Sequence, residues 1–209
     1  LNEFLATLET IQARLYNPIS IVEWNSNKRY LKELALKGVK TMPLEIVDNQ
    51  SELSEKIENM SGDDFVVKPL ISAGAKGLIR FNKNNPPQIT ESMILQKCYP
   101  EIFEGEISRF YFNHKFSYGI KKTPKPGEIR VQEEFGGIIT PYDPNHAELD
   151  MAKAAIDAIP GESLYARVDI VPKIGIIELE CVEPSLYLSS FKQSAKLFVN
   201  ALEQKIKPL

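Results

Sequence analysis

Acidic residues near the end of the chain could bind a divalent cation. Asp169 follows Arg167 on one apolar segment, and Glu178 and Glu180 lie two apart on the next, with Glu183 just beyond. Alternate residues of a strand face the same side, so Glu178 and Glu180 project together. Two neighbouring carboxylates repel each other unless a cation joins them, and oxygen ligands without histidine suit Mg²⁺ or Mn²⁺. The pattern predicts a metal site at Asp169, Glu178 and Glu180.

Arg167 is the candidate catalytic residue beside this site. It shares the strand parity of Asp169, so its guanidinium would point into the same place. There it can stabilise charge that develops on a transferred phosphoryl group or a tetrahedral carbon. The alternative is that Glu178 and Glu180 line the solvent-facing edge of an antiparallel strand. That alternative leaves the pairing of Arg167 with Asp169 as a coincidence.

Two lysines upstream could hold phosphate groups. Lys68 ends the apolar run Phe65-Val66-Val67, where an unpaired ammonium is costly to bury, so it must meet an anion or reach solvent. A snorkelling surface lysine is the alternative. Lys28 is expected in the first turn of a helix capped by Asn25 or Ser26. Both lysines are candidates for contacts with phosphates.

A loop of small residues follows Lys68. Ser72-Ala73-Gly74-Ala75-Lys76-Gly77 lets backbone N–H groups approach a phosphate closely, and Lys76 adds a mobile positive charge. The loop is not a P-loop, because no Gly-Lys-Ser/Thr follows a four-residue gap. A flexible hairpin turn is the alternative.

A third group of polar residues lies between the lysines and the acidic residues. It contains Gln96-Lys97-Cys98-Tyr99, Glu101 and Glu106, then Lys121-Lys122 and Arg130. A strand that passes into an extended link can offer backbone groups to an adenine edge, and a nearby carboxylate can bind ribose hydroxyls. Strand alternation lets only one of the two adjacent lysines face a cleft.

Composition excludes several classes of function. The 209 residues are 43% apolar with a formal net charge of -3, which is typical of a globular protein. No apolar run approaches the ~20 residues needed to cross a bilayer, and no basic block offers a footprint for nucleic acid. Two distant cysteines and two histidines lack the parts of a zinc site or a histidine-based triad. A reduced, cytoplasmic setting fits best, without nucleic-acid or membrane partners.

The start of the chain predicts a missing upstream piece. Leu1 is not a methionine, and no charged-then-apolar leader follows it. We expect residues 1–24 to be the remnant of an N-terminal region. Residues 25–97 are expected to form a first lobe that contains the loop 72–77. Residues 98–209 are expected to form a second lobe with the metal-site strands and a C-terminal helix.

Hydrophobic periodicity predicts the elements that must position these residues. Helices are expected at residues 2–15, 26–37, 49–59, 148–159 and 191–206. Strands are expected at residues 65–69, 78–81, 94–96, 165–171 and 174–182, with a further hairpin over residues 106–118. In that hairpin Arg109 is expected on the surface and His114 in the turn. The class is α+β with antiparallel hairpins in two lobes.

The order of these motifs resembles the ATP-grasp superfamily. The motifs are Asn27-Lys28-Arg29-Tyr30-Leu31, Val66-Val67-Lys68-Pro69, the Gly74/Gly77 loop, Gln96-Lys97, Gly105-Glu106, Arg167-Val168-Asp169 and Glu178-Leu179-Glu180. The chain is most similar to the branch of cycloserine-biosynthesis ligases, related to glutathione synthetase. Features of that branch are Glu23-Trp24-Asn25-Ser26-Asn27-Lys28, Gly105-Glu106-Ile107-Ser108, Arg130-Val131-Gln132-Glu133 with Gly136-Gly137, and the Glu183-Pro184-Ser185-Leu186 segment. The match runs from about residue 17 to residue 190.

The resemblance implies an ATP- and Mg²⁺-dependent ligase with a nucleotide cleft between two α+β lobes. A small carboxylate would be activated as an acyl phosphate and captured by an amine, a thiol or another nucleophile. The implied nucleotide contacts are Lys28, Lys68, Ser72, Gly74, Lys76, Gly77, Gln96, Lys97, Tyr99, Glu101, Glu106 and Lys122. Among them, the lysines and the loop would hold phosphates, the backbone at Lys97 and Tyr99 would read adenine, and Glu106 or Glu101 would bind the ribose. Asp169, Glu178 and Glu180 would hold Mg²⁺, and Arg167 with Arg130 would stabilise acyl transfer.

Two departures from the family pattern leave alternatives open. The family commonly has asparagine as the last metal ligand, where this chain has Glu180, acting alone or with Glu183. The family also carries a further N-terminal domain, whereas only 27 residues precede Lys28, so we expect a fragment. A non-catalytic nucleotide-binding regulatory module and a phosphotransferase with the same cleft are the alternatives to a ligase. The oligomeric state stays open, with a homodimer among the options.

Overall fold

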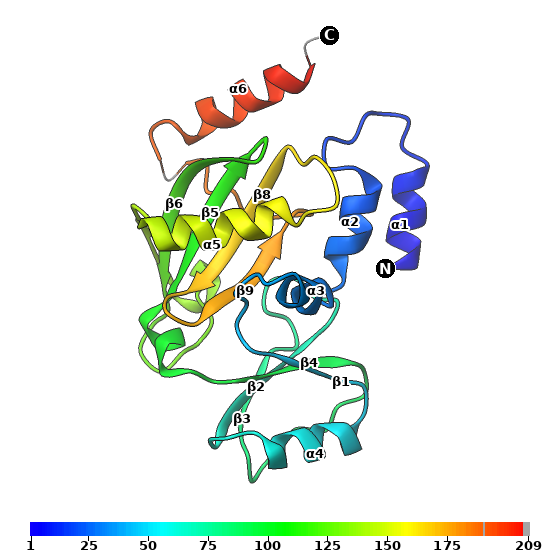
Figure 1. Ribbon diagram of the computed structural model, residues 1–209, viewed down its shortest axis with the longest axis vertical. Helices are drawn as coiled ribbons and strands as arrows, with labels where there is room; N and C mark the ends of the chain where they lie inside the picture. Colours follow the sequence, from blue (N-terminus) through cyan, green and yellow to red (C-terminus); the bar gives the residue numbers. More distant parts are fainter. Residues whose placement is uncertain (190, 207–209) are drawn as a thin grey trace.

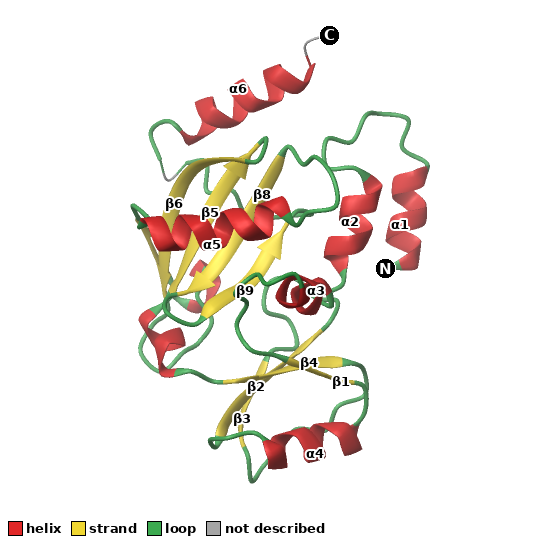
Figure 2. Cartoon of the chain, in the orientation of Figure 1, coloured by secondary structure: helices red, strands yellow, loops and turns green. Residues whose placement is uncertain are grey.

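Two antiparallel sheets form the framework of the protein. The computed structural model describes residues 1–189 and 191–206, and Figure 1 and Figure 2 show the sheets one above the other, with helices packed on both. The smaller sheet has the strand order β1-β4-β2-β3 and comprises β1 (Glu45–Val47), β2 (Asp64–Pro69), β3 (Ile79–Asn82) and β4 (Met93–Lys97). The larger sheet has the order β7-β6-β5-β8-β9 and comprises β5 (Glu106–Phe112), β6 (Lys115–Thr123), β7 (Ile138–Pro141), β8 (Tyr165–Val171) and β9 (Gly175–Glu180). The predicted α+β class is confirmed.

The smaller sheet separates an apolar core from a polar face. Helix α4 (Gln50–Asn59) covers one side of it, where Phe65 and Val67 of β2 pack with Leu53. The Asn49 side chain caps α4 by accepting a hydrogen bond from the Glu52 backbone N–H at 3.0 Å. Strand alternation turns the intervening residues of β2, and those of the neighbouring β4, toward the other side of the sheet.

The larger sheet is covered on one face by helix α5 (His146–Asp157), which crosses the front of the sheet in Figure 1. Ala152 and Ile156 of α5 share a core with Val168 and Leu179 of β8 and β9. Helix α6 (Ser194–Ile206) packs at one end of the sheet. Because α5 takes the residues of one parity, the alternate residues of β8 and β9 face the opposite side.

Three helices precede the first strand. They are α1 (Asn2–Glu9), α2 (Ile19–Ser26) and α3 (Tyr30–Leu36), and two short 3-10 turns lie at Pro100–Glu104 and Glu133–Phe135. Residues of α2 and α3 pack into the same core as α5. The gap between β4 and β5 falls next to the expected lobe boundary at residues 97/98, while the division into lobes itself stays a prediction.

Several expectations about the helices are wrong. The helix expected at residues 2–15 ends at Glu9, because none of its side chains is buried and no packing rewards a longer helix. Asn25 and Ser26 end α2 rather than cap the next helix, and Lys28 lies in the turn between α2 and α3. An unpredicted helix, α2, begins directly after Pro18 and places Asn25 in its last turn, where the Asn25 amide bonds Leu179 and Cys181 instead. The short strands β1 and β7 were also not predicted.

Arg109 is not on the hairpin surface. Its side chain is fully buried, and its guanidinium donates to the Glu148 carboxylate at 2.6 Å in an ion pair beneath α5. His114, in contrast, lies in the hairpin turn as expected, and its ring accepts a hydrogen bond from the Ser163 backbone N–H. Among the described helices, none combines the length and the apolar character that a membrane crossing requires.

The two cysteines provide a test of the packing. Burial raises the pKa of the Cys98 thiol to about 11 and that of Cys181 to about 12. A pKa above the ambient pH leaves little thiolate, which is the reactive form. At pH 7.5 we expect iodoacetamide to modify both thiols at least about tenfold more slowly in the native protein than in urea, with mass spectrometry as the readout. Rapid modification of either thiol in the native protein would contradict this packing.

Candidate active site

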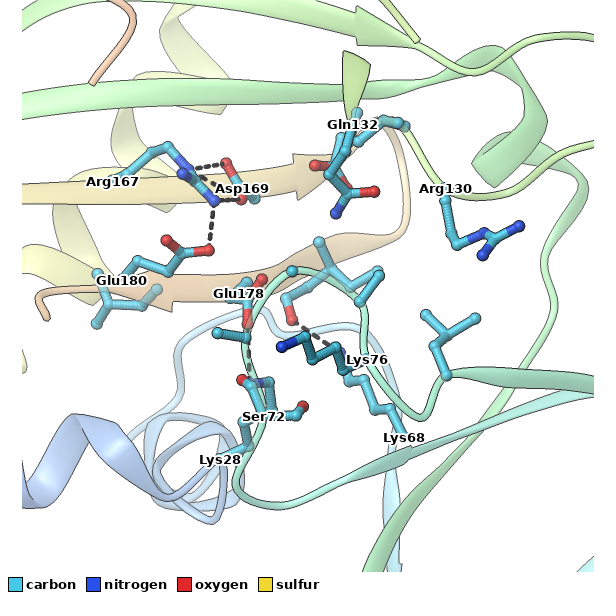
Figure 3. A pocket seen from close by; sticks show the side chains of 18 of the residues that line it. Lys28, Lys68, Ser72, Lys76, Arg130, Gln132, Arg167, Asp169, Glu178 and Glu180 are labelled. Atoms are coloured by element: carbon cyan, nitrogen blue, oxygen red, sulfur yellow. Dashed lines mark hydrogen bonds and ion pairs between the residues drawn. The ribbon is translucent and has the colours of Figure 1, made fainter. Parts of the chain in front are cut away.

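A cavity of about 550 Å³ lies between the polar faces of the two sheets (Figure 3). The smaller sheet contributes residues of β2 and β4, the larger sheet contributes residues of β5, β6, β8 and β9, and residues 71–76 form part of the wall. The predicted site residues on this wall are Lys28, Lys68, Ser72, Gly74, Lys76, Gln96, Glu106, Lys122, Arg130, Arg167, Asp169, Glu178 and Glu180. The fold therefore gathers most of the predicted residues around one space.

Asp169, Glu178 and Glu180 form a compact group of carboxylates on β8 and β9. One oxygen of each lies within 4.8 Å of the others. The antiparallel register places Asp169 directly opposite Glu178, which explains how two strands build one site. β9 is an edge strand, yet both glutamates face the cavity and their side chains are about three-quarters buried. Three convergent oxygen ligands fit a Mg²⁺ ion, and Glu183 lies outside this group.

Arg167 holds two of these carboxylates in place. Its guanidinium donates three hydrogen bonds to Asp169, at 2.8 to 3.1 Å, and also pairs with Glu180 directly across the strand pair. Burial alone would raise the pKa of Asp169, but the charges of Arg167 and Lys122 and the Ser108 hydroxyl hold it well below its usual range. Asp169 is therefore an anion at neutral pH.

Glu180 and Glu178 differ from each other in protonation. Burial raises the pKa of Glu180 to about 8, although Arg167 opposes this shift. Burial also disfavours the charged form of Glu178, but the pKa of Glu178 is lowered because Lys28 and Lys68 outweigh that effect. A divalent cation between the two carboxylates would favour the ionised form of both.

Lys122 rather than Lys121 faces the cavity, in agreement with strand alternation. Its ammonium pairs with Glu106, directly opposite on β5, and contacts Asp169 at 3.2 Å. The ammonium group is almost completely buried. Burial lowers the pKa of Lys122, but the two carboxylates more than compensate and the net shift is upward. Lys122 therefore stays charged in the interior of the site.

Lys28 ties the small-residue loop to the metal-site strand. Its ammonium donates to the Ser72 carbonyl at 2.6 Å and contacts the Glu178 carboxylate at 3.2 Å (Figure 3). Its backbone N–H donates to the Leu70 carbonyl. Lys28 thus holds the chain at Leu70 and at Ser72, where the loop begins.

Lys68 is the buried cation with the least compensation. Only 8% of its surface is exposed, and among the described residues no carboxylate lies within ion-pair distance of its ammonium. Within the described part of the chain, its ammonium makes one hydrogen bond, a long one of 3.4 Å to the Ile177 carbonyl. Burial lowers the pKa of Lys68. A buried ammonium in this state favours an incoming anion.

Apolar side chains and one unpaired amide also line the cavity. Met42, Val66 and Ile102 belong to one buried cluster beside β2 and β4. Gln96 projects from β4 next to them; it is 2% exposed, and within the described part of the chain its Nε2 has no hydrogen-bond partner. A flat heterocycle with acceptor nitrogens, such as adenine, would fit this slot and satisfy the amide.

Four predicted residues lie off the cavity wall: Gly77, Lys97, Tyr99 and Glu101. Lys97 alternates with Gln96, so its side chain points away and lies beside Gly62. Glu101 lies in the 3-10 turn, which leaves Glu106 as the ribose candidate. Gly77 has a role in shape: its φ is +73°, and a Cβ there would stand 2.7 Å from the Pro69 ring.

Arg130 lies across the cavity from the carboxylates, as Figure 3 shows. Its guanidinium donates to Glu128 at 2.5 Å and stacks over the Phe135 ring at 3.9 Å. The hydrogen bonds from Arg130 lower the pKa of Glu128 to about 2. The structure therefore brings Arg130 to the wall but not into contact with Arg167.

Sequence reasoning missed several residues that build the site. The Asn25 amide donates to the Leu179 carbonyl at 2.8 Å and accepts from the Cys181 N–H, so it fixes β9 from the α2 side. The Tyr30 hydroxyl accepts from the Leu179 N–H. Ser108 bonds Asp169 from the neighbouring strand. Ser108 could have been found, because it lies two residues after Glu106 on β5 and so faces the same side of the sheet. No local pattern marks Asn25.

These features define an ATP-grasp fold, and comparison with known proteins supports it. No protein-family model matches the chain. The cycloserine biosynthesis protein DcsG of Streptomyces lavendulae is 27% identical over 99% of this chain and 79% of its own length. A crystal structure of the D-cycloserine synthetase DcsG has a TM-score of 0.82 at 25% identity, with the same coverage.

More distant proteins are similar in sequence or in fold. The glutathione synthetase of Bordetella pertussis is 23% identical over a region that covers 67% of this chain and 49% of that protein. The ATP-grasp ligase PsnB, solved with Mg and ADP, has a TM-score of 0.69 at 12% identity and covers 96% of this chain and 65% of its own. The resemblance to ATP-grasp ligases, in the branch of DcsG and glutathione synthetase, is confirmed.

The charge network makes a prediction about stability. Asp169→Asn leaves Arg167 and Lys122 buried without their shared anion, so we expect the free energy of unfolding to fall by about 3 kcal/mol. Urea denaturation of the ligand-free protein measures it. Asp157→Asn is the matched control, because Asp157 forms an exposed ion pair with Lys153, and it should cost less than about 1 kcal/mol. Equal effects of the two substitutions would refute the proposed central position of Asp169.

Proposed function

We propose that the chain is an ATP- and Mg²⁺-dependent ligase that joins a small carboxylate to an amine or a thiol through an acyl phosphate. One observation carries the proposal: the buried Lys68, which has no carboxylate within ion-pair distance among the described residues, faces the same cavity as the Asp169, Glu178 and Glu180 carboxylates. Such a cavity suits a ligand that brings phosphates and a divalent cation together. The names of the relatives support ligation as the outcome.

In this proposal the nucleotide lies across the two sheets. The Gln96 amide and the apolar slot bind adenine, and Glu106 binds the ribose. Lys28 and Lys68 neutralise the α- and β-phosphates, and residues 72–77 cover the β/γ end. Lys122 contacts the phosphates from the larger sheet.

Asp169, Glu178 and Glu180 would hold the magnesium. When bound, Mg²⁺ would supply neutralisation of the charge on the phosphate oxygens. Asp169 is already ionised and oriented by Arg167 and Ser108, so its position requires little rearrangement. Glu180 stands where the family usually has asparagine, and it would act as a third anionic ligand of the metal.

The chemistry has two balanced steps. An oxygen of the substrate carboxylate attacks the γ-phosphorus, the bond from that phosphorus to the β–γ bridging oxygen breaks, and ADP leaves with the bond's electrons. The amine nitrogen then attacks the acyl carbon, the bond from that carbon to the phosphate oxygen breaks, phosphate leaves with the bond's electrons, and the proton of the nitrogen passes to solvent. Arg167, with Arg130 on the opposite wall, would stabilise negative charge on the transferred group and the tetrahedral centre. Catalysis arises mainly from positioning and charge neutralisation.

The buried position of Arg167 favours an enzyme over a regulatory nucleotide sensor. A sensor needs only contacts with the bound nucleotide. The Arg167 guanidinium, held by the Asp169 and Glu180 carboxylates, is positioned to stabilise negative charge that develops in a transition state. A phosphotransferase using the same cleft is the second candidate. Both cysteines are free and buried, which is compatible with the reducing, cytoplasmic setting that we propose.

Lys68 gives a test in which nucleotide binding should weaken while the stability of the protein does not fall. Lys68→Met removes a buried charge without an ionic partner, so the ligand-free protein should become more stable or stay equally stable. The same substitution should weaken binding of a non-hydrolysable ATP analogue with Mg²⁺ about tenfold or more. Urea denaturation and calorimetry measure the two effects.

Lys56→Met is the control for Lys68→Met. Lys56 pairs with Glu45 on the surface of the smaller sheet, and its loss should change neither quantity by much. Unchanged nucleotide affinity in Lys68→Met would contradict the phosphate role. Absence of heat with the wild-type protein, with and without Mg²⁺, would overturn the proposed function.

Phosphate release separates the candidate functions. The protein is incubated with ATP, Mg²⁺ and pairs drawn from a panel of amino acids and small amines. A ligase should release phosphate only when a carboxylate and a nucleophile are both present, because the second step requires both. A phosphotransferase should form ADP and a stable phosphorylated product with no free phosphate. Nucleotide binding without turnover across the panel would favour the sensor.

A further inference from the structure

The segment after β9 forms one wall of the cavity. The proposed function assigns no role to this segment. Val182, Glu183, Ser185 and Tyr187 all line the space beside the carboxylates. Glu183, considered above as a further metal ligand, lies outside the carboxylate group, and the other three are not among the expected nucleotide or metal contacts. Tyr187 has the most distinctive conformation of the four.

Tyr187 has a backbone conformation that a bulky residue rarely adopts. Its φ is +48°, in the left-handed region. Three of the other non-glycine residues with positive φ, Asn113, His114 and Lys173, lie in hairpin turns that require this geometry. The remaining one, Ala75, lies in the loop over the cavity. Strain of this kind persists where the surroundings impose it, and it gathers at functional sites.

Three side chains impose this conformation on the segment. The Tyr118 hydroxyl donates to the Leu186 carbonyl, and the Ser194 hydroxyl donates to the Leu188 carbonyl at 2.6 Å. The Arg167 guanidinium contacts the Ser185 carbonyl at 3.4 Å. The backbone is therefore held on both sides of Tyr187, once by the same arginine that holds Asp169.

The Tyr187 ring is fixed as well. It packs edge-on against Phe110, with ring centroids 6.3 Å apart and an interplanar angle of 69°. Phe110 in turn stacks on Tyr118, the residue that holds Leu186. The ring thus has a rigid aromatic support on the sheet.

The Tyr187 hydroxyl is left without a partner. Among residues 1–189 and 191–206 it makes no hydrogen bond, although the side chain is half-buried on the cavity wall. Burial raises its pKa, while the nearby charges of Lys122 and Arg167 act to lower it and that of Asp169 acts to raise it. The phenol therefore keeps its proton at neutral pH and stands near the charged groups proposed to surround the phosphates.

We propose that Tyr187 is a substrate-contacting residue whose phenol donates a hydrogen bond to an oxygen of the phosphoryl group in transfer. This inference rests on the proposed function. Lys122 and Arg167 supply positive charge to the same place, and a phosphoryl group has three oxygens that can each accept a donor. A donor held in advance by a strained backbone stabilises charge on those oxygens without reorganisation.

Tyr187→Phe tests the inference, because it keeps the ring, its packing and the backbone conformation but removes the donor. The probes are ADP with Mg²⁺, and ADP with Mg²⁺ and aluminium fluoride, which occupies the position of a phosphoryl group in transfer. Calorimetry should show about tenfold weaker binding of the aluminium fluoride complex by the variant, because a charge-assisted hydrogen bond is lost. The affinity for ADP with Mg²⁺ alone and the melting temperature should stay at wild-type values.

Tyr16→Phe is the matched control, since Tyr16 does not line the cavity, and it should leave both affinities unchanged. Equal affinities of wild-type protein and Tyr187→Phe for both probes would overturn the inference and leave the proposed function intact. A parallel loss for both probes would also overturn it, because Tyr187 would then support the site as a whole. Wild-type protein that binds neither probe would overturn the proposed function together with the inference.

Discussion

The cost of burying charge governs the arrangement of the whole site. Antiparallel pairing across β6, β5, β8 and β9 places charged and polar side chains opposite one another on one face, and burial there removes most of their hydration. Asp169 is the centre of this arrangement, since Arg167 and Lys122 both reach it. Across neighbouring strands, Lys122 meets Glu106 and Arg167 meets Glu180. The register of the larger sheet therefore determines both which charges can be buried and where they meet.

This self-neutralised network has a consequence for ligand binding. The groups proposed to hold phosphates, Lys28 and Lys122, are paired with the groups proposed to hold Mg²⁺ and ribose. A metal ion alone would draw the carboxylates away and leave buried ammonium groups uncompensated, whereas a nucleotide alone would do the reverse. A nucleotide with its metal exchanges both partners at once, so the net burial of charge changes little. Lys68 is the exception to the internal pairing, which makes it the natural first contact for the anion.

The part of the site that rests on alternation could be predicted from the sequence, and the part that rests on register could not. Arg167 shares a parity with Asp169, and Glu178 with Glu180, because the rule acts within one strand. The contacts of Asp169 with Ser108 and Lys122 depend on how three strands align, which no local pattern states. Arg109 was misplaced for the same reason, since its burial depends on α5, 39 residues further along the chain. The predicted start of the second helix was wrong because the Asn25 side chain, a possible cap, bonds the Leu179 carbonyl of β9 instead.

The two halves of the site belong to two sheets that share buried apolar side chains: Ile94 of β4 lies in one cluster with Val168 of β8, and Val66 of β2 lies in another with Val171. The smaller sheet packs its own apolar layer under α4, and the larger sheet packs under α5 and α6. The bonds between the halves converge on β9: Met42 donates its backbone N–H to the Ile176 carbonyl at 2.8 Å, and Lys68 contacts the Ile177 carbonyl. Next to these, Lys28 joins Ser72 to Glu178. β9 therefore carries both the proposed metal ligands and polar contacts between the two halves, and an anion that takes Lys28 and Lys68 would replace two of those contacts.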